Sequence, residues 1–227
     1  MAVNIVAKID DLVAVKNVAV SVSNKAGLDK LAPALVALCP GVKIYSTGGT
    51  YTSLKDILKD KAKKHLVAVS DYTGQPEMQG GLVKTLDWKI YLGLLSETYN
   101  PAHCSDLKKY RAVNFDLVVV NLYPFEQTIA KSGATAEEAR ANIDIGGPCM
   151  IRASAKNYIR VCPVVDPGDY GKLLSELKKS KGKLSLKFRK EMAQKAFKHT
   201  GHYDRAIADY FAKTAISKVR EAYKEIV

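Results

Sequence analysis

The sequence lacks paired cysteines and long apolar runs. Its four cysteines lie far apart and form no C-x-x-C pair, a pattern typical of a reducing compartment rather than of a secreted disulfide scaffold. No segment approaches the roughly 18 consecutive apolar residues needed to cross a bilayer, and the opening MAVNIVAKID does not resemble a secretion signal. We therefore expect a soluble, cytoplasmic protein without a membrane partner.

Signatures of the common nucleotide and metal sites are also missing. The sequence contains neither G-x-x-x-x-G-K-[ST] nor G-x-G-x-x-G, so nothing in it points to ATP or a dinucleotide. His199 and His202 could share a helix face, but a zinc site needs further ligands and no cysteine has a matching spacing. We expect no metal and no cofactor, and interpret both histidines as structural or peripheral.

Acidic residues are scarce in the last quarter of the chain. The whole chain carries 35 Lys and Arg against 23 Asp and Glu, and residues 171–227 alone hold 15 against 6. A solvated helical face explains this excess, and a site for an anionic small molecule is the alternative. Because no helix-turn-helix, zinc-finger or RNA-binding aromatic signature accompanies the excess, we expect no nucleic acid partner.

Short β-branched runs alternate with helical patterns along most of the chain. The predicted strands are 17–23, 42–46, 66–71, 115–123 and 161–166. Helices are predicted between them, one with a capping box formed by Thr135 and Glu138. The alternation predicts one α/β domain over residues 1–227, with a parallel sheet and covering helices in a core of about 17–166 and an entirely helical part of about 167–227. Ligands of such sheets bind beyond the carboxyl ends of the strands.

Three segments combine glycine and polar residues in a way that could hold a phosphate. In residues 21–27 (SVSNKAG) the hydroxyls either cap the next helix or leave its N–H groups to an anion, with Lys25 adding charge. In residues 46–50 (STGGT) two glycines allow close approach of a ligand to the backbone. In residues 78–85 (MQGGLVKT) a glycine pair precedes lysine and threonine. Each segment alone also has an ordinary structural explanation, which is a helix cap for the first, a turn for the second and a solvated surface for the third.

The strongest pair of segments is NLYP at 121–124 and DIGGP at 144–148. The first closes the most apolar strand, and the second predicts a helix start with proline at its first position, whose free N–H groups suit an oxyanion. Arg152 and Lys156 lie one turn apart on that helix, and such stacked cations need an anion between them, either Asp144 or a ligand. A lysine so placed could have a lowered pKa, which suits proton transfer.

Six segments together resemble one known family in order and spacing. They are SVSNKAGL, STGGT, TGQPEMQGGLVKTL, VVVNLYPF, NIDIGGPCMIRASAKN and AFKHTGHYDRAIADYF. The chain from about residue 17 to residue 212 thus resembles the IMP cyclohydrolase domain, the N-terminal half of the bifunctional AICAR transformylase/IMP cyclohydrolases of purine biosynthesis. The resemblance implies a methylglyoxal-synthase-like fold and a hydrolase of the cyclic-amidine class that closes FAICAR to IMP without metal or cofactor. Only a short tail follows the last segment, so we expect a stand-alone cyclohydrolase.

The resemblance also implies roles for residues at the matching positions. Lys156 matches the proton donor or acceptor, and with Tyr123 it would move protons on the attacking nitrogen and the departing hydroxyl. Asp144 would orient the carboxamide, and Lys84 would stabilise charge on the formyl oxygen. The substrate-binding residues implied by the resemblance are Ser23, Asn24, Lys25, Thr47, Gly48, Gly49, Thr50, Thr85, Asn121, Ile145 and Gly146.

The sequence departs from the family pattern around this predicted site. Leu82 stands where the family has arginine, Asp87 and Trp88 stand where it has His-Pro, and Asn24 replaces aspartate. Basic residues of the C-terminal part could restore the lost charge. The resemblance further implies a homodimer that binds FAICAR and IMP, with a separate AICAR-formylating enzyme as a candidate partner.

Two alternatives on the same fold stay open. One is a non-catalytic, nucleotide-binding regulatory domain, and the other is methylglyoxal synthase, a lyase acting on a triose phosphate. The presence of Lys84, Tyr123 and Asp144 together with Lys156 favours catalysis, because a sensor needs phosphate contacts but no proton relay. The NLYP and IDIGG segments favour the larger purine precursor.

Overall fold

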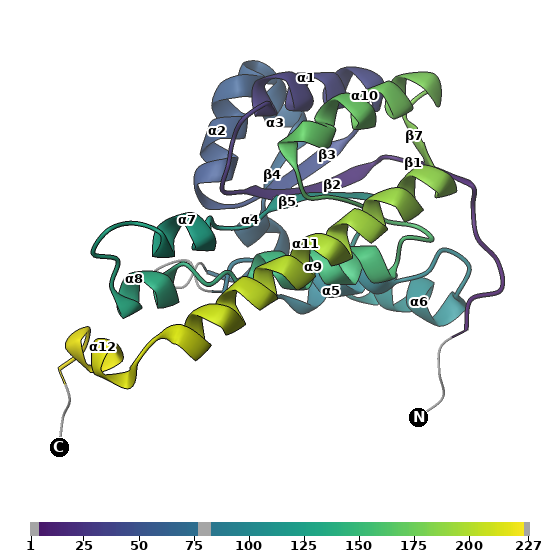
Figure 1. The fold of residues 1–227 in the computed structure, drawn as a ribbon. Helices are drawn as coiled ribbons and strands as arrows, with labels where there is room; N and C mark the ends of the chain where they lie inside the picture. The colour runs from purple at the N-terminus through teal and green to yellow at the C-terminus, as the bar shows by residue number, and fades with distance from the viewer. Residues whose placement is uncertain (1–4, 77–82, 225–227) are drawn as a thin grey trace.

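Five parallel strands form the central sheet of the computed structural model, which describes residues 5–76 and 83–224. They are β2 (Asn17–Val22), β3 (Lys43–Ser46), β4 (Leu66–Ala68), β5 (Leu117–Asn121) and β6 (Cys162–Val164). Their order is β4-β3-β2-β5-β6, so the chain moves outward from β2 first to one side and then to the other (Figure 1). The predicted α/β fold with a parallel sheet is therefore confirmed.

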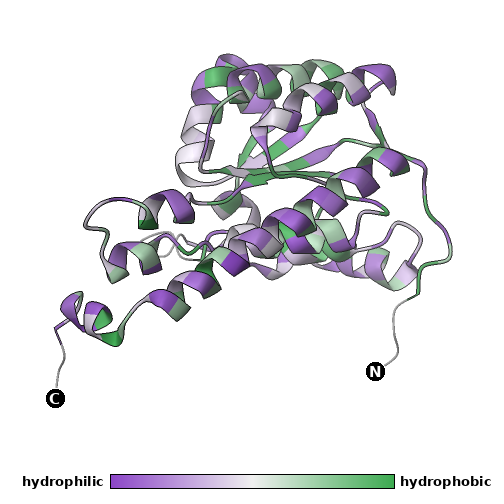
Figure 2. Cartoon of the chain, viewed as in Figure 1, coloured by the Kyte–Doolittle hydropathy of each residue, from purple (hydrophilic) through white to green (hydrophobic). Residues whose placement is uncertain are grey.

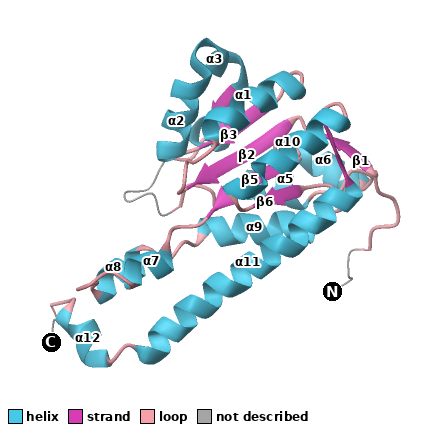
Figure 3. Cartoon of the chain, turned by 45° about the horizontal axis from the view of Figure 1, so that its top comes forward, coloured by secondary structure: helices cyan, strands magenta, loops and turns pink. Residues whose placement is uncertain are grey.

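Helices cover both faces of this sheet (Figures 1 and 3). On one face lie α1 (Leu28–Leu38), α2 (Gly48–Leu58) and α10 (Tyr170–Lys179), and on the other lie α5 (Trp88–Leu95), α9 (Gly146–Lys156) and α11 (Leu186–Lys213). The shorter elements are α3 (Ala62–His65), α4 (Val69–Thr73), α6 (Pro101–Lys109), α7 (Phe125–Ile129), α8 (Ala136–Ala141), α12 (Ile216–Glu221) and the 3-10 turns η1 (Lys59–Lys61) and η3 (Pro167–Asp169).

Successive side chains along a strand belong alternately to two separate apolar cores. Val18 and Val20 of β2 face α1 and α10, whereas Ala19 joins Val118 and Val120 against α5 and α9. The apolar residues concentrate on the strands in Figure 2, as expected of a sheet buried on both faces. In the described part of the chain, no helix combines the length and apolarity of a membrane span.

Two local predictions about secondary structure are wrong. Residues 69–71 continue as the helix α4 rather than as strand, because the chain turns directly after Ala68, which has extended backbone angles, and closes a helical turn before the left-handed Gly74. The expectation of an entirely helical part after residue 167 fails at β7 (Lys183–Ser185). This strand pairs antiparallel with β1 (Leu12–Ala14), a contact between distant segments that local periodicity does not reveal.

The long helix α11 is continuous over 28 residues. It runs from Leu186 through Gly201 to Lys213, packing first on α9 and β6 and then on α7 (Figure 1). The predicted capping box is present at α8, where Thr135 accepts from the N–H of Glu138 and the Glu138 carboxylate accepts from the N–H of Thr135.

The first turn of α11 carries a fully buried arginine, Arg189. Its guanidinium donates five hydrogen bonds of 2.5–3.0 Å to backbone carbonyls, which belong to Asp10, Asp11, Tyr158, Ile159 and Leu184. Since every N–H of the guanidinium is used, this one side chain joins the N-terminal segment, the turn before β6 and the strand β7.

We expect Arg189→Met to destabilise the fold by about 3 kcal/mol or more, because buried carbonyls would lose charged donors. Urea unfolding of the variant measures the loss. Lys190→Met removes the same charge from the next, exposed residue and should change stability by no more than about 0.5 kcal/mol. Equal stability of the two variants would contradict the structural role of Arg189.

Candidate active site

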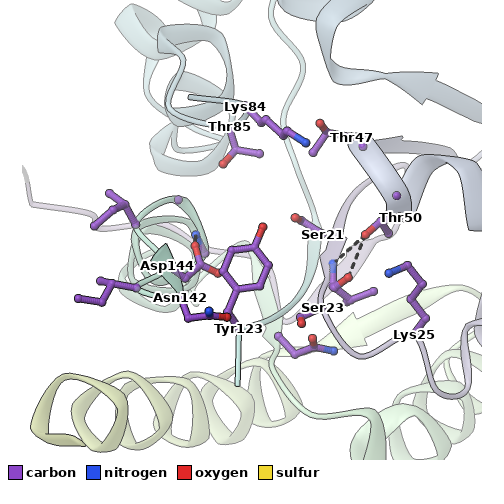
Figure 4. Close-up of a pocket in the computed structure, with 18 of the residues that line it drawn as sticks. Ser21, Ser23, Lys25, Thr47, Thr50, Lys84, Thr85, Tyr123, Asn142 and Asp144 are labelled. Atoms are coloured by element: carbon purple, nitrogen blue, oxygen red, sulfur yellow. Dashed lines mark hydrogen bonds between the residues drawn. The ribbon is translucent and has the colours of Figure 1, made fainter. Parts of the chain in front are cut away.

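A pocket of about 370 Å³ opens beyond the carboxyl ends of the central strands (Figure 4). Its size lies in the range of small-molecule sites, and it occupies the edge of the sheet where ligands of parallel sheets bind. It is lined by Ser21, Val22, Ser23, Lys25, Thr47, Gly48, Gly49, Thr50, Lys84, Thr85, Asn121, Tyr123, Ala141, Asn142, Ile143, Asp144, Ile145, Gly146 and Gly147. All of the predicted site residues line it except Asn24 and Lys156.

Two helices begin at the pocket. α2 starts at Gly48 and α9 at Gly146, each is eleven residues long, and neither is capped by the side chain of the residue before it. The N-terminal N–H groups and the positive end of the helix dipole favour an anion at such a position. The pocket therefore has a built-in preference for negative charge at two points of its wall.

Lysine ammonium groups lie beside the start of α2. A Cβ on Gly48 would lie 2.7 Å from Nζ of Lys84, and a Cβ on Gly49 would lie 3.9 Å from Nζ of Lys25. Gly48 also has a positive φ of 51°, which side-chain-bearing residues rarely adopt. The glycine pair thus makes room for two cations at one helix start, which is an arrangement suited to a phosphate.

The loop after β2 does not form the helix cap that the sequence predicted. The N-cap of α1 is Gly27 in the left-handed conformation, with no side-chain hydrogen bond, so Ser21 and Ser23 do not cap α1 and instead line the pocket. The N–H of Asn24 donates to Oδ1 of Asn121 at 2.8 Å, and Nδ2 of Asn121 donates back to the carbonyl of Asn24 at 2.9 Å. Asn121 thereby fixes the loop, and Asn24 lies outside the pocket lining.

Thr50 also has a structural task that the sequence did not indicate. Its hydroxyl donates to the carbonyl of Val22 at 3.0 Å and accepts from the N–H of the same residue at 3.2 Å. The only proton of the hydroxyl is therefore used to join α2 to the end of β2. Thr50 lines the pocket, but its hydroxyl has no second proton to donate to a ligand.

Asp144 forms the opposite wall of the pocket. Its Oδ1 accepts the N–H of Gly147 at 2.8 Å, and burial raises the pKa of the carboxyl group, while backbone hydrogen bonds from Gly147 and Tyr123 act in the opposite direction. A Cβ on Gly146 would lie 2.6 Å from Oγ1 of Thr85, and one on Gly147 would lie 2.5 Å from Oδ2 of Asp144. The glycine pair therefore allows both polar side chains to approach the helix start.

The start of α9 differs in register from the prediction. The helix begins at Gly146, so Pro148 is its third residue and not its first.

Tyr123 and Ile145 line the pocket with 50% and 57% of their surface exposed, which leaves an aromatic ring and an aliphatic chain available to a ligand. Asn142, which precedes the IDIGG turn, also lines the pocket; the sequence reasoning missed it, although its neighbours were identified.

Lys156 does not share the pocket with Lys84, Tyr123 and Asp144. It is exposed at the last position of α9, about 15 Å along the helix axis from Gly146 at 1.5 Å per residue. The predicted anion between Arg152 and Lys156 is not Asp144, which lies at the other end of the helix; the Arg152 guanidinium lies 5.6 Å from the centre of the Phe197 ring. Within one chain, the predicted role of Lys156 in proton transfer therefore has no geometric support.

Two of the departures from the family pattern, Asp87 and Trp88, lie beside the pocket rather than in it. Leu82 lies outside the described residues. Asp87 caps α5 through the N–H of Lys89, and Trp88 is 62% exposed, with its ring 6.0 Å from that of Tyr110. Asp87 and Trp88 border a neighbouring hollow of about 260 Å³ that meets the main pocket at Thr47 and Lys84.

The two histidines of α11 have different surroundings. His202 lies 2.9 Å from the carboxylate of Glu126, and burial lowers the pKa of His199. Among residues 5–76 and 83–224, no group of three or more His, Cys, Asp and Glu side chains could hold a metal ion.

Comparison with known proteins gives two family matches and a set of relatives. Residues 27–149 match the MGS-like domain, and residues 154–226 match the AICARFT/IMPCHase bienzyme model. The bifunctional purine biosynthesis protein PurH of Trichormus variabilis is 47% identical over 194 residues, which are 86% of this chain and 37% of the relative. PurH of Acetivibrio thermocellus is 46% identical over 196 residues, with the same coverage. The chain thus spans little more than a third of the length of these relatives.

A solved structure is also similar. The crystal structure of ForH superimposes with a TM-score of 0.72 at 31% sequence identity, covering 87% of this chain and all of that one. This similarity supports the fold described above.

Proposed function

Because this chain belongs to the MGS-like domain family and is similar over 86% of its length to bifunctional purine biosynthesis proteins, we propose that it is an IMP cyclohydrolase. It would close FAICAR (5-formamidoimidazole-4-carboxamide ribotide) to IMP with loss of water. One observation carries the proposal: Lys84, Tyr123 and Asp144, which lie on three separate segments, line one pocket that also receives two helix starts.

Ring closure joins the carboxamide nitrogen of FAICAR to its own formyl carbon. The new N–C bond forms, the carboxamide nitrogen and the formamide nitrogen each lose a proton, and the formyl oxygen leaves with both protons as water. The reaction needs a proton acceptor at the nitrogen, positive charge near the formyl oxygen and a pocket that holds both arms of the substrate together.

The ribotide phosphate is assigned to the start of α2. Lys25 and the first N–H groups of α2 supply positive charge there, and Ser23 supplies a hydroxyl in the same wall. Lys84, for which the resemblance implies a role at the formyl oxygen, instead has its ammonium beside Gly48 and joins Lys25 at the phosphate. The imidazole with its two arms then extends toward the opposite wall, where Thr85, Tyr123 and Asp144 lie (Figure 4). This orientation places the negative end of the substrate away from the Asp144 carboxylate.

Asp144 and Tyr123 are the proton-handling groups within this pocket. Burial raises the pKa of Asp144, which makes its carboxylate a better proton acceptor for the carboxamide nitrogen. The Tyr123 hydroxyl can donate to the departing oxygen, and the N–H groups at the start of α9 lie on the wall where charge develops on that oxygen. Each group thus has a single task in the step.

Lys156 stands apart from this scheme, although the resemblance implies that it donates or accepts the proton. The variant Lys156→Ala distinguishes the two assignments. Retained turnover would assign proton transfer to Asp144 and Tyr123, and lost turnover with intact IMP binding would mean that Lys156 reaches the pocket of a second chain in a homodimer. Sedimentation of the protein with IMP measures whether that second chain is present.

Turnover of FAICAR tests the proposal directly. The ultraviolet change that accompanies purine formation should follow saturation kinetics, faster than spontaneous closure. IMP binding without turnover would instead indicate a regulatory nucleotide-binding domain, and conversion of dihydroxyacetone phosphate would indicate methylglyoxal synthase. Either result would overturn the cyclohydrolase assignment.

A further inference from the structure

The hydroxyl of Tyr203 connects the long helix α11 to the turn that carries Asp144. It accepts the N–H of Asp144 at 2.8 Å and donates to the carbonyl of Asn142 at 3.1 Å. Tyr203 is buried and does not itself line the pocket, whereas Asn142 and Asp144 both do. The two hydrogen bonds join positions about sixty residues apart, so the turn is fixed by a distant helix and not only by its own sequence.

Asp144 is held at both its backbone and its side chain. Tyr203 takes the backbone N–H, and the N–H of Gly147 donates to the carboxylate Oδ1 at 2.8 Å. The second carboxylate oxygen, Oδ2, lies where a Cβ on Gly147 would come within 2.5 Å. These contacts fix the main chain of Asp144 and restrict the rotation of its carboxylate. The position of the turn therefore determines where the carboxylate points relative to the pocket.

The ring of Tyr203 packs against the segment that carries Tyr123. Its centre lies 6.2 Å from that of Phe125, with the planes at 70°, and Phe125 is fully buried two residues after Tyr123. The N–H of Phe125 donates to the carbonyl of Tyr123 at 2.8 Å. One side chain of α11 therefore contacts both the segment carrying Tyr123 and the turn carrying Asp144.

We propose that Tyr203 is a positioning residue, which sets the relative placement of Asp144 and Tyr123 through its hydroxyl and its ring. Its catalytic consequence rests on the proposed cyclohydrolase function, in which these two groups move protons on one substrate. Because the phosphate site at α2 lies on the other wall of the pocket, Tyr203 affects the chemical step and not the binding of the nucleotide.

The variant Tyr203→Phe removes the hydroxyl and keeps the ring that packs on Phe125. We expect kcat for FAICAR to fall about 10- to 100-fold, since small misplacements of reacting groups cost this much, with KM changed by less than about threefold. Backbone amide exchange of residues 142–144 should become about tenfold faster, because the Asp144 N–H loses its partner.

Tyr210→Phe is the matched control. Tyr210 lies on the same helix and packs on the same Phe125 ring at 5.7 Å, so this variant removes a hydroxyl without touching the Asp144 turn, and it should leave kcat and exchange unchanged. Unaltered exchange at 142–144 in Tyr203→Phe would overturn the proposal whatever the activity. Faster exchange with wild-type kcat would overturn its catalytic part, and faster exchange in a protein that never turns over FAICAR would refute the proposed function alone.

Discussion

Asp144→Asn is expected to lower the turnover of FAICAR by about 10²- to 10³-fold, the range typical of losing a positioned acid or base. The amide keeps the size of the side chain and can still accept the N–H of Gly147 through its oxygen. It cannot take a proton from the carboxamide nitrogen. IMP affinity should stay close to that of the wild type, because the phosphate site lies on the opposite wall.

The same substitution should leave the folded protein at least as stable at neutral pH. Burial raises the pKa of Asp144 in the fold, so the folded state binds the proton more tightly than the unfolded chain, and the stability contributed by this group declines as pH rises from its ordinary pKa through the raised one. Because asparagine does not titrate, the variant does not lose stability in this way. Urea unfolding measures the free energy of unfolding of both proteins at neutral and acidic pH. The difference between the wild type and the variant should become smaller at acidic pH.

A loss of both stability and activity would contradict this assignment of Asp144. Such a result would mean that the carboxylate holds the turn together, and that reduced turnover reflects a disturbed pocket. A stable variant with little turnover matches the general finding that catalytic groups are placed at some cost to stability.

Lys84→Met is expected to reduce kcat/KM by about 10- to 100-fold, because the substrate phosphate at the start of α2 would lose one of its two positive charges. Methionine keeps the length of the chain, so the space beside Gly48 stays filled. Steady-state kinetics with FAICAR measures the effect.

Lys55→Met is the control for Lys84→Met. Lys55 is exposed in the last turn of α2, away from the pocket, and its loss changes the net charge of the protein by the same amount. Equal effects of the two variants would show that overall charge, rather than the ammonium at the start of α2, attracts the substrate.

The sheet and most of the pocket were predictable from the sequence because both depend on local patterns. The apolar run ending at Asn121 and the β-branched run ending at Val22 define neighbouring parallel strands, and parallel strands place their carboxyl ends at one edge. Glycines and polar residues after those strands therefore had to meet. The prediction of Lys84, Tyr123 and Asp144 in one pocket followed from the resemblance and agrees with this geometry.

Two of the features that the sequence did not reveal are contacts between distant segments. Arg189 lies in a lysine-rich stretch that the sequence indicates as a solvated face, yet it is fully buried against five carbonyls. Tyr203 follows the periodicity of an ordinary core residue, and nothing local shows that its hydroxyl reaches Asp144. Lys156 is a different case: it follows Asp144 by about three helical turns, and it was expected in the pocket only because of the resemblance.

A crystal structure with IMP bound would show whether the pocket holds a ribotide between the start of α2 and the turn of Asp144. We expect the phosphate against the N–H groups of Gly48 and Gly49 beside Lys25, with the purine base between Tyr123 and Asp144. Density for the phosphate at the far end of α9 beside Lys156, or for the nucleotide outside this pocket, would contradict it.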